Sequence, residues 1–296
     1  MSQAPIPSLF GFLVKCWREL AAVCIFLAVG LGLGAATPHN AAFYERDLAL
    51  SRERIAASVP TPLLVVLAAA LPGAVVFLLE CLAHWRKGRG GCVQPTVLLG
   101  LGLALTSTLL ATDALKNFFG IKRPNFFDLC KYATYDAAID THDAASPEWE
   151  LYLNLTRAGQ PGTLAKCAGS AALTTDAQRS FPSGHASLSF AGLGFLALAL
   201  RAFLGVREGD FFSPLALASA SPLALAFFIA GTRVRENWHR EQDVAVGALL
   251  GAVGAVLGWR QVLALGGAPV PSLFAPSPKA DDEASGGTAV SSLQGP

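Results

Sequence analysis

Residues 232–243 concentrate reactive side chains between two long apolar runs, where charge near a bilayer is costly. Read as a helix, this stretch places His239 and Asp243 four residues apart on one face. A carboxylate in that position can accept a hydrogen bond from one imidazole nitrogen. The other nitrogen is then left basic, as a nucleophile or a general base requires. Arg233 lies close enough in the chain to serve the same pocket. The alternative is a solvated loop carrying ordinary charges.

A second cluster follows another apolar run and contains Lys116 and Arg123-Pro124. Lys116 and Arg123 are seven residues apart, which predicts that they stack on one helix face over two turns. Pro124 disfavours helix at Arg123, so the helix should end near there. Asp113, three residues before Lys116, can pair with it. Snorkelling of a cation at a helix end is the alternative, but we expect this end to be non-cytosolic, where Lys and Arg are less common.

A third cluster, Pro182-Ser183-Gly184-His185, precedes an apolar run. Proline followed by serine favours a helix start. The backbone N–H groups of Ser183 and Gly184 would then be free, and the helix dipole would favour an anion there. Gly184 lets a ligand approach the backbone closely, and His185 would stand at the rim. A capped helix with an incidental histidine is the alternative.

Together the clusters supply cations, amide donors and two histidines to one face of a membrane. Cations and amide donors suit the charged oxygens of a phosphate. A His–Asp pair suits attack on phosphorus, and a second histidine suits protonation of the leaving oxygen. No carboxylate cluster of metal-binding type accompanies them in the sequence. We therefore expect phosphoryl transfer through a phosphohistidine, with no metal site and no cofactor.

The elements that must position these clusters are membrane helices. The sequence is 53% hydrophobic and 15% charged, which is too apolar for an ordinary soluble domain. Six apolar runs approach the length of about 20 residues that spans a bilayer. We expect an all-α polytopic membrane protein with six transmembrane helices in a bundle, at residues 20–36, 61–83, 95–116, 183–203, 212–230 and 244–265. Small residues in the sixth run should allow close helix packing.

The basic connector at 84–89 predicts that the loops on the opposite side, including 120–180, are luminal or extracellular. We expect a cytosolic lead-in at 1–19, a phosphatase domain at 20–268 with a long polar loop at 120–180, and a disordered cytosolic tail at 269–296. The first apolar run should be retained rather than cleaved as a signal peptide.

The long loop carries two further predictions. Asn154-Leu-Thr156 is a glycosylation sequon, and Cys130 and Cys167 could form a disulfide if the loop faces an oxidising compartment. The chain has no basic block with interleaved aromatic residues, so we do not expect it to bind nucleic acid.

The three clusters resemble the three-part signature of the type 2 phosphatidic acid phosphatase superfamily, K-x6-RP, PSGH and SR-x5-H-x3-D. Their order and spacing match, and Thr232 stands where the family usually has serine. Threonine keeps the hydroxyl group, so we expect little loss. Over residues 20–265 the chain is similar to plant and fungal lipid phosphate phosphatases. The resemblance also implies the six-helix fold that the superfamily shares with vanadate-binding chloroperoxidases.

The resemblance implies a role for each matching residue. His239 would be the nucleophile, Asp243 its orienting partner and His185 the acid for the leaving group. The residues that would bind phosphate are Lys116, Arg123, Ser183, Gly184 and Arg233. The implied substrates are phosphatidic acid, lysophosphatidic acid and diacylglycerol pyrophosphate, hydrolysed without Mg²⁺. The membrane would be the endoplasmic reticulum or the plasma membrane.

Other functions stay open at the sequence level. The same histidine chemistry permits transfer of a phospho-head group to an acceptor other than water. Related branches act on sphingoid-base or polyprenyl phosphates. A catalytically silent lipid-binding protein is a third class, but it has no chemical need for His185, His239 and Asp243 together. The sequence does not indicate an oligomeric state.

Overall fold

The computed structural model describes residues 9–86 and 95–266. Within these ranges six helices are long and apolar enough to cross a membrane, which confirms the predicted all-α polytopic fold. They are α2 (Trp17–Ala35), a broken second span from Thr61, α5 (Thr96–Phe119), α10 (Gly184–Phe203), α11 (Pro214–Arg235) and α12 (Glu241–Ala264). A short helix, α1 (Leu9–Lys15), precedes α2. The predicted disordered tail and residues 87–89 of the basic connector lie outside the described residues.

The second span is divided into α3 (Thr61–Val65), a π-helical turn η2 (Val66–Ala70) and α4 (Leu71–Arg86). Pro72 explains the break because it has no N–H to donate to the carbonyl four residues earlier, which belongs to Ala68. That carbonyl lies against Gly192 of α10, where a Cβ atom would come within 1.7 Å of it. The irregular turn therefore lets the second span lie directly on α10.

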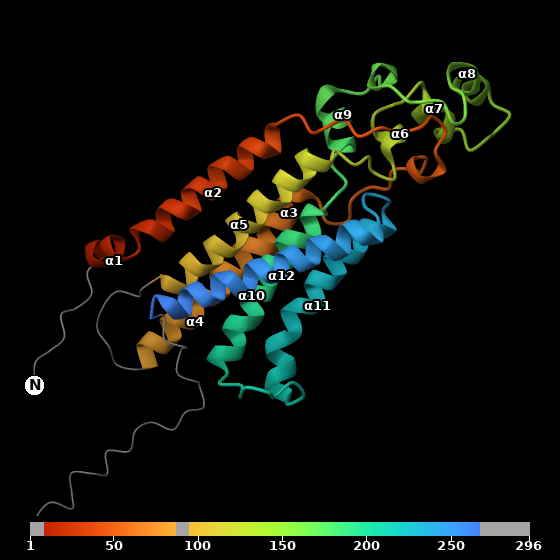
Figure 1. The fold of residues 1–296 in the computed structure, drawn as a ribbon. Coiled ribbons are helices and arrows are strands. Elements are labelled where there is room, and N and C mark those ends of the chain that lie inside the picture. The colour runs from red at the N-terminus through yellow and green to blue at the C-terminus, as the bar shows by residue number, and fades with distance from the viewer. Residues whose placement is uncertain (1–8, 87–94, 267–296) are drawn as a thin grey trace, which may run out of the picture.

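Helix α10 lies at the centre of the bundle and packs against α5, α11 and α12. The small residues of α12 make this packing close, as the sequence predicts. A Cβ atom on Gly251 would lie 2.1 Å from the carbonyl oxygen of Ser187, and one on Gly247 would lie 2.5 Å from that of Ser183. The first turns of α10 and α12 consequently meet the last turns of α5 and α11 at one end of the bundle (Figure 1).

At that end the segment predicted as a polar loop is instead a folded lobe. It contains α6 (Phe126–Leu129), α7 (Tyr135–Asp140), α8 (Pro147–Leu155), η3 (Leu164–Lys166) and α9 (Ala171–Ala177). The segment between α2 and α3 joins it and includes η1 (Leu48–Leu50). Buried aromatic side chains form the lobe's core, namely Phe43, Phe126, Phe127, Tyr132, Tyr135 and Tyr152. The lobe is thus held by its own apolar core.

Two polar features reinforce the lobe. Cys130 and Cys167 form a disulfide, with their Cα atoms 5.1 Å apart. Glu45 is buried and its carboxylate accepts hydrogen bonds from Nζ of Lys166 (2.6 Å), the hydroxyl of Tyr132 (2.8 Å) and the backbone N–H of Arg157 (2.8 Å). Burial opposes the ionisation of Glu45, but these hydrogen bonds outweigh burial and lower its pKa.

Lys122 fastens the lobe to the end of α5. Its side chain is 3% exposed, and Nζ donates to the side-chain oxygens of Asn40 (2.8 Å) and Gln178 (3.0 Å). Nζ also lies 5.6 Å from the centre of the Phe43 ring. Burial lowers the pKa of Lys122 to about 8. Asn154, the predicted glycosylation residue, is exposed on α8, on the same lobe.

Candidate active site

A cavity of about 400 Å³ lies where the lobe meets the bundle. All three sequence clusters contribute to it, although they are far apart in the chain. Its lining includes seven of the predicted site residues, Asp113, Lys116, Arg123, Gly184, His185, Arg233 and His239. Apolar residues of α3, α5 and α10 line it as well. The cavity therefore combines positive charge and imidazoles with a wall formed by membrane helices.

The helix predicted for residues 232–243 is wrong. Helix α11 ends at Arg235 and α12 begins at Glu241, so His239 lies in the turn between them. Asn237 has φ 60°, a left-handed conformation that asparagine tolerates better than most residues and that ends the helix. Asp243 lies in the first turn of α12, where its carboxylate accepts the backbone N–H of Arg240 (3.0 Å).

The partner of the His239 ring is also different from the predicted one. Nδ1 lies 2.7 Å from the carbonyl oxygen of Ser180 and 3.9 Å from Oδ2 of Asp243, which is too long for a hydrogen bond. Because a carbonyl only accepts, Nδ1 carries the proton and Nε2 is left unprotonated. The hydroxyl of Ser180 donates to Oδ2 of Asp243 (2.7 Å). Asp243 is therefore linked to His239 through Ser180.

The electrostatic surroundings of His239 keep its ring neutral. The residue is 3% exposed, and burial lowers its pKa well below the ordinary value, helped by the positive charges of Arg123 and Lys116. Nη1 of Arg123 lies 3.4 Å from Nε2. The guanidinium can only donate, so the unprotonated Nε2 accepts from it. A neutral imidazole whose unprotonated nitrogen lies beside a guanidinium is suited to attack an anion held by that cation.

Arg123 reaches the cavity from outside a helix. The predicted stacking of Lys116 and Arg123 on one helix face is wrong because α5 ends before Gly120, which has φ 58°. The guanidinium of Arg123 donates through Nη2 to Oδ1 of Asp176 (2.6 Å) and through Nε to the Asp176 carbonyl (2.7 Å). It also lies 5.1 Å from the ring of Trp238. Neither Asp176 nor Trp238 was identified from the sequence.

Pro124 continues this segment away from the cavity, and its carbonyl accepts the backbone N–H of Arg52 (3.0 Å). The chain after Arg123 is therefore joined to the segment that precedes α3. Pro124 supports the site through the backbone rather than by lining the cavity.

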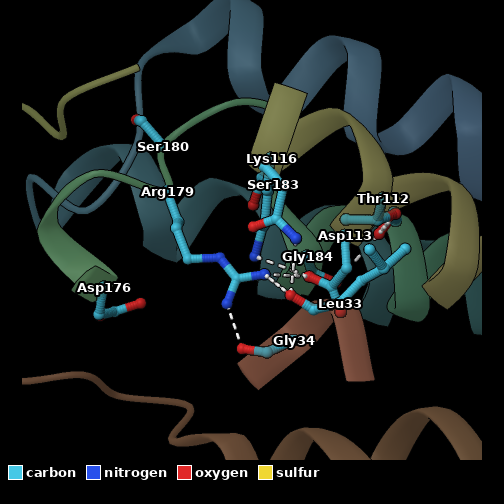
Figure 2. Close-up of polar contacts among 12 residues, drawn as sticks. Leu33, Gly34, Thr112, Asp113, Lys116, Asp176, Arg179, Ser180, Ser183 and Gly184 are labelled. Carbon is cyan, nitrogen blue, oxygen red and sulfur yellow. Dashed lines mark hydrogen bonds and ion pairs between the residues drawn. The ribbon is translucent and has the colours of Figure 1, made fainter. Parts of the chain in front are cut away.

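Lys116 belongs to a charged network at the end of α2, shown in Figure 2. Its Nζ lies 3.9 Å from Oδ1 of Asp113, the partner expected from the sequence. The same carboxylate lies 3.4 Å from Nη2 of Arg179. Arg179 also donates to the carbonyl oxygens of Leu33 (3.0 Å) and Gly34 at the end of α2. Asp113 therefore holds Lys116 at the cavity while Arg179 fixes α2 beside it.

The third cluster forms the start of α10, as predicted, but one of its amides is occupied. The hydroxyl of Ser183 accepts the backbone N–H of Ala186 (3.4 Å), whereas its own N–H donates to the carbonyl of Asp243 (2.9 Å). The prediction of a free Ser183 amide is therefore wrong, because the close packing of α12 supplies an acceptor. Gly184 is the first helical residue, where an N–H has no acceptor within the helix. A Cβ atom there would lie 3.1 Å from Nζ of Lys116.

His185 faces the same cavity from the first turn of α10. Its Nε2 lies 3.0 Å from the carbonyl oxygen of Val59, to which it donates. Nδ1 is then the ring atom that can exchange a proton with a ligand. The segment before α3 thus determines which nitrogen of His185 is available.

Arg233 is held by its neighbours on α11. The residue is 2% exposed, and its Nε and Nη2 each lie 3.1 Å from the hydroxyl oxygen of Thr232. Nη2 also donates to Oε2 of Glu236 (2.5 Å), which sequence reasoning missed. Thr232 donates in turn to the Ile229 carbonyl (2.8 Å). The hydroxyl group of Thr232 therefore orients Arg233, and the hydroxyl group of a serine could make the same contact.

Comparisons with known proteins agree with this geometry. A family model described as the PAP2 superfamily matches residues 97–266. Lipid phosphate phosphatase 1 of Arabidopsis thaliana is 33% identical over 164 residues, which cover 55% of this chain and 44% of that protein.

Probable diacylglycerol pyrophosphate phosphatase 1 of Schizosaccharomyces pombe is 27% identical over 259 residues, covering 83% of this chain and 82% of the relative. Diacylglycerol pyrophosphate phosphatase 1 of Saccharomyces cerevisiae is 28% identical over 234 residues, which cover 76% of this chain and 72% of that protein. The match thus spans less than half of the Arabidopsis protein but most of each yeast protein. No solved structure matches the chain significantly.

Proposed function

The chain belongs to the PAP2 superfamily, and from that premise we propose that it is a phosphatase of membrane lipid phosphates. Its substrates would be phosphatidic acid and related lipids such as lysophosphatidic acid and diacylglycerol pyrophosphate. The observation that carries the proposal is a cavity, bordered by membrane helices, that is lined by three cations and two histidines. The names of the Arabidopsis and yeast relatives support the same substrate class.

In the proposed reaction, Nε2 of His239 attacks the phosphorus atom. The bond between phosphorus and the lipid oxygen breaks, and the departing oxygen takes the Nδ1 proton of His185, which must enter the reaction as an imidazolium because its Nε2 proton is held by the Val59 carbonyl. His239 is left as a phosphohistidine with its Nδ1 proton held by the Ser180 carbonyl. Water then attacks the phosphorus and gives a proton to His185, which restores both histidines and releases inorganic phosphate.

The phosphate oxygens would be bound by Lys116, Arg123 and Arg233, with the Gly184 N–H at the positive end of α10. Ser183 would act differently, because its N–H is already bonded to Asp243. We assign Ser183 to capping α10 and joining that helix to α12. The positive charge opposite the phosphate would come from the protein, so we expect the reaction to need no Mg²⁺.

We further propose that residues 20–268 form the phosphatase domain and that the cavity faces the lumen or the cell exterior. The lobe beside the cavity carries both the disulfide and the exposed Asn154. A glycan and a disulfide both belong to that side of a membrane. Loss of a glycosidase-sensitive mass shift in Asn154→Gln would support this orientation, whereas labelling of the lobe by a membrane-impermeant reagent only from the cytosol would refute it.

The test of function is phosphate release from phosphatidic acid in detergent micelles with excess EDTA, comparing the wild type with His239→Ala. Activity that EDTA spares and His239→Ala abolishes would support the proposal. A folded wild type that releases no phosphate from any lipid phosphate would refute it. Transfer of the phosphoryl or head group to a labelled acceptor, without free phosphate, would instead identify a transferase.

A further inference from the structure

The buried side chain of Glu236 joins two parts of the site that lie far apart in the chain. Glu236 is 2% exposed and caps the end of α11. One carboxylate oxygen, Oε2, accepts Nη2 of Arg233 (2.5 Å), while the other, Oε1, accepts the backbone N–H of Ser58 (2.9 Å). A buried carboxylate is costly unless its oxygens are bonded. Both bonds therefore offset the cost of burying the Glu236 side chain in this position.

Ser58 belongs to residues 52–59, a segment that we call the strap because it crosses the turn between α11 and α12. The strap is bonded along its length to the two residues after Glu236. Nε1 of Trp238 donates to the carbonyl of Ile55 (2.9 Å), and Nδ2 of Asn237 donates to the carbonyl of Glu53 (3.0 Å). The side chains of the turn that carries His239 thus bind the backbone of the strap.

The last residue of the strap, Val59, contacts His185. Val59 follows Ser58 directly, and its carbonyl accepts Nε2 of His185 (3.0 Å). One oxygen of Glu236 therefore bonds Arg233. The other bonds Ser58, the neighbour of Val59, whose carbonyl bonds His185. One carboxylate thus contacts the guanidinium of Arg233 directly and the imidazole of His185 through the backbone of residues 58 and 59.

We propose that Glu236 is a positioning residue that aligns the phosphate with the proton donor for the leaving group. The proposal rests on the proposed phosphatase function. Without the carboxylate, Arg233 loses its charged partner and the strap loses the bond beside Val59. Phosphate binding and protonation of the leaving oxygen should then weaken together, although Glu236 itself touches neither the substrate nor the reacting atoms.

Two substrates separate positioning from general destabilisation. Phosphatidic acid releases a glycerol oxygen, a poor leaving group that needs a proton. Diacylglycerol pyrophosphate releases a phosphate oxygen of phosphatidic acid, a much better leaving group that needs a proton less. Misplacement of His185 should therefore slow the first reaction more than the second. A loss of folded protein would lower both rates by the same factor.

The experiment compares wild type, Glu236→Gln, Glu236→Asp and the matched control Glu241→Gln, an exposed residue in the first turn of α12. Glutamine keeps the size, but its NH2 group would face either Arg233 or the Ser58 N–H, and both are donors. For Glu236→Gln we expect kcat on phosphatidic acid to fall about tenfold or more and kcat on diacylglycerol pyrophosphate to fall by less than about threefold. KM should rise for both substrates, and the control should match the wild type.

Equal losses of kcat on the two substrates, or none, would overturn the proposal. Hydrogen exchange of residues 52–59 gives a second readout that does not depend on activity. Faster exchange in Glu236→Gln than in Glu241→Gln is expected, and unchanged exchange would also overturn the proposal. A wild type inactive on both lipids would refute the proposed function instead, and the exchange measurement would still test the strap.

Discussion

The carboxylate of Asp243 lies 3.9 Å from Nδ1 of His239. In the proposed reaction the imidazole would gain positive charge when Nε2 bonds phosphorus, and Asp243 would then face a cation. For two unit charges 3.9 Å apart in an effective dielectric of about 20, the attraction is about 4 kcal/mol. Since about 1.4 kcal/mol changes a rate tenfold, Asp243→Asn should lower kcat about a thousandfold. Asparagine can still accept the Arg240 N–H, so α12 should remain capped.

The structure adds a second, smaller effect that the sequence did not suggest. Ser180 carries the carbonyl that holds Nδ1 of His239, and its hydroxyl donates to Asp243. Ser180→Ala removes a hydrogen bond to a charged group, worth about 1.5–3 kcal/mol, so we expect kcat to fall about 10- to 100-fold. The double variant should lose less than the product of the two factors, because both changes act on one contact.

The assay measures kcat on phosphatidic acid and traps the phosphohistidine by rapid quenching at alkaline pH. The matched control is Ser219→Ala, which removes a buried hydroxyl that donates only within its own helix, to Ala216 (2.7 Å). Asp243→Asn should form the phosphoenzyme slowly while its thermal stability stays close to that of the wild type. The reasoning would be refuted by a folded Asp243→Asn within about tenfold of wild-type kcat, or by a Ser180→Ala variant that behaves like Ser219→Ala.

Three further predictions concern the frame around the site. Because hydrogen bonds lower the pKa of Glu45 below its ordinary value of 4.5, the lobe's stability should be constant above that pH and fall as the pH drops below it. In thermal melts from pH 7 down to about 3, Glu45→Gln should lose this pH dependence and be about 2 kcal/mol less stable at pH 7. Cys167→Ser breaks the lobe's disulfide and should cost about 2–4 kcal/mol in the same melts, while finding both wild-type thiols free by non-reducing peptide mapping would contradict the pairing. Gly247→Leu places a Cβ atom 2.5 Å from the Ser183 carbonyl and should lower kcat at least about tenfold, whereas Ala245→Leu, on the exposed face of α12, should not.

The positions predicted correctly are those that short distances in the chain determine. Apolar runs of bilayer length gave the six spans, and the clusters gave the residues that meet in the cavity. Pairing of Lys116 with Asp113 follows from a three-residue spacing on a continuous helix. Spacings of this kind predict contacts correctly because the geometry of a helix is fixed.

The errors arose where the chain leaves a helix. The prediction of a helix through His239 assumed regular geometry across a turn in which Asn237 has a positive φ. The partner of His239 was missed for a related reason, since Ser180 is 59 residues away and reaches the ring through its backbone. Glu236 lies three residues after Arg233, so their pairing could have been predicted from the sequence. Its second contact could not, because the donor is a backbone N–H 178 residues away and any residue except proline has one.

The lobe was underestimated because its apolar residues follow no helical or strand period. Aromatic residues at 126, 127, 132, 135, 149 and 152 were the available signal, since such density is unusual in a solvated loop. Their consequence for the site is direct, because α9 of this lobe presents Asp176 to Arg123. The lobe therefore holds in place a cation that lines the cavity, and through it the lobe would act in the proposed reaction.

The pairing of cations with carboxylates explains how the site can be both stable when empty and able to turn over. The three cations that line the cavity, and Arg179 beside them, each lie within 3.9 Å of a carboxylate oxygen, in the pairs Lys116–Asp113, Arg179–Asp113, Arg123–Asp176 and Arg233–Glu236. Such partners offset the cost of burying positive charge near a membrane before any phosphate arrives. In the proposed reaction they would also compete with the phosphate for the cations, which would limit how tightly the product is held. Asp176 is the most exposed of these carboxylates, at 45% for its side chain, and so would be the one best placed to yield Arg123 to the proposed substrate and to reclaim it when phosphate leaves.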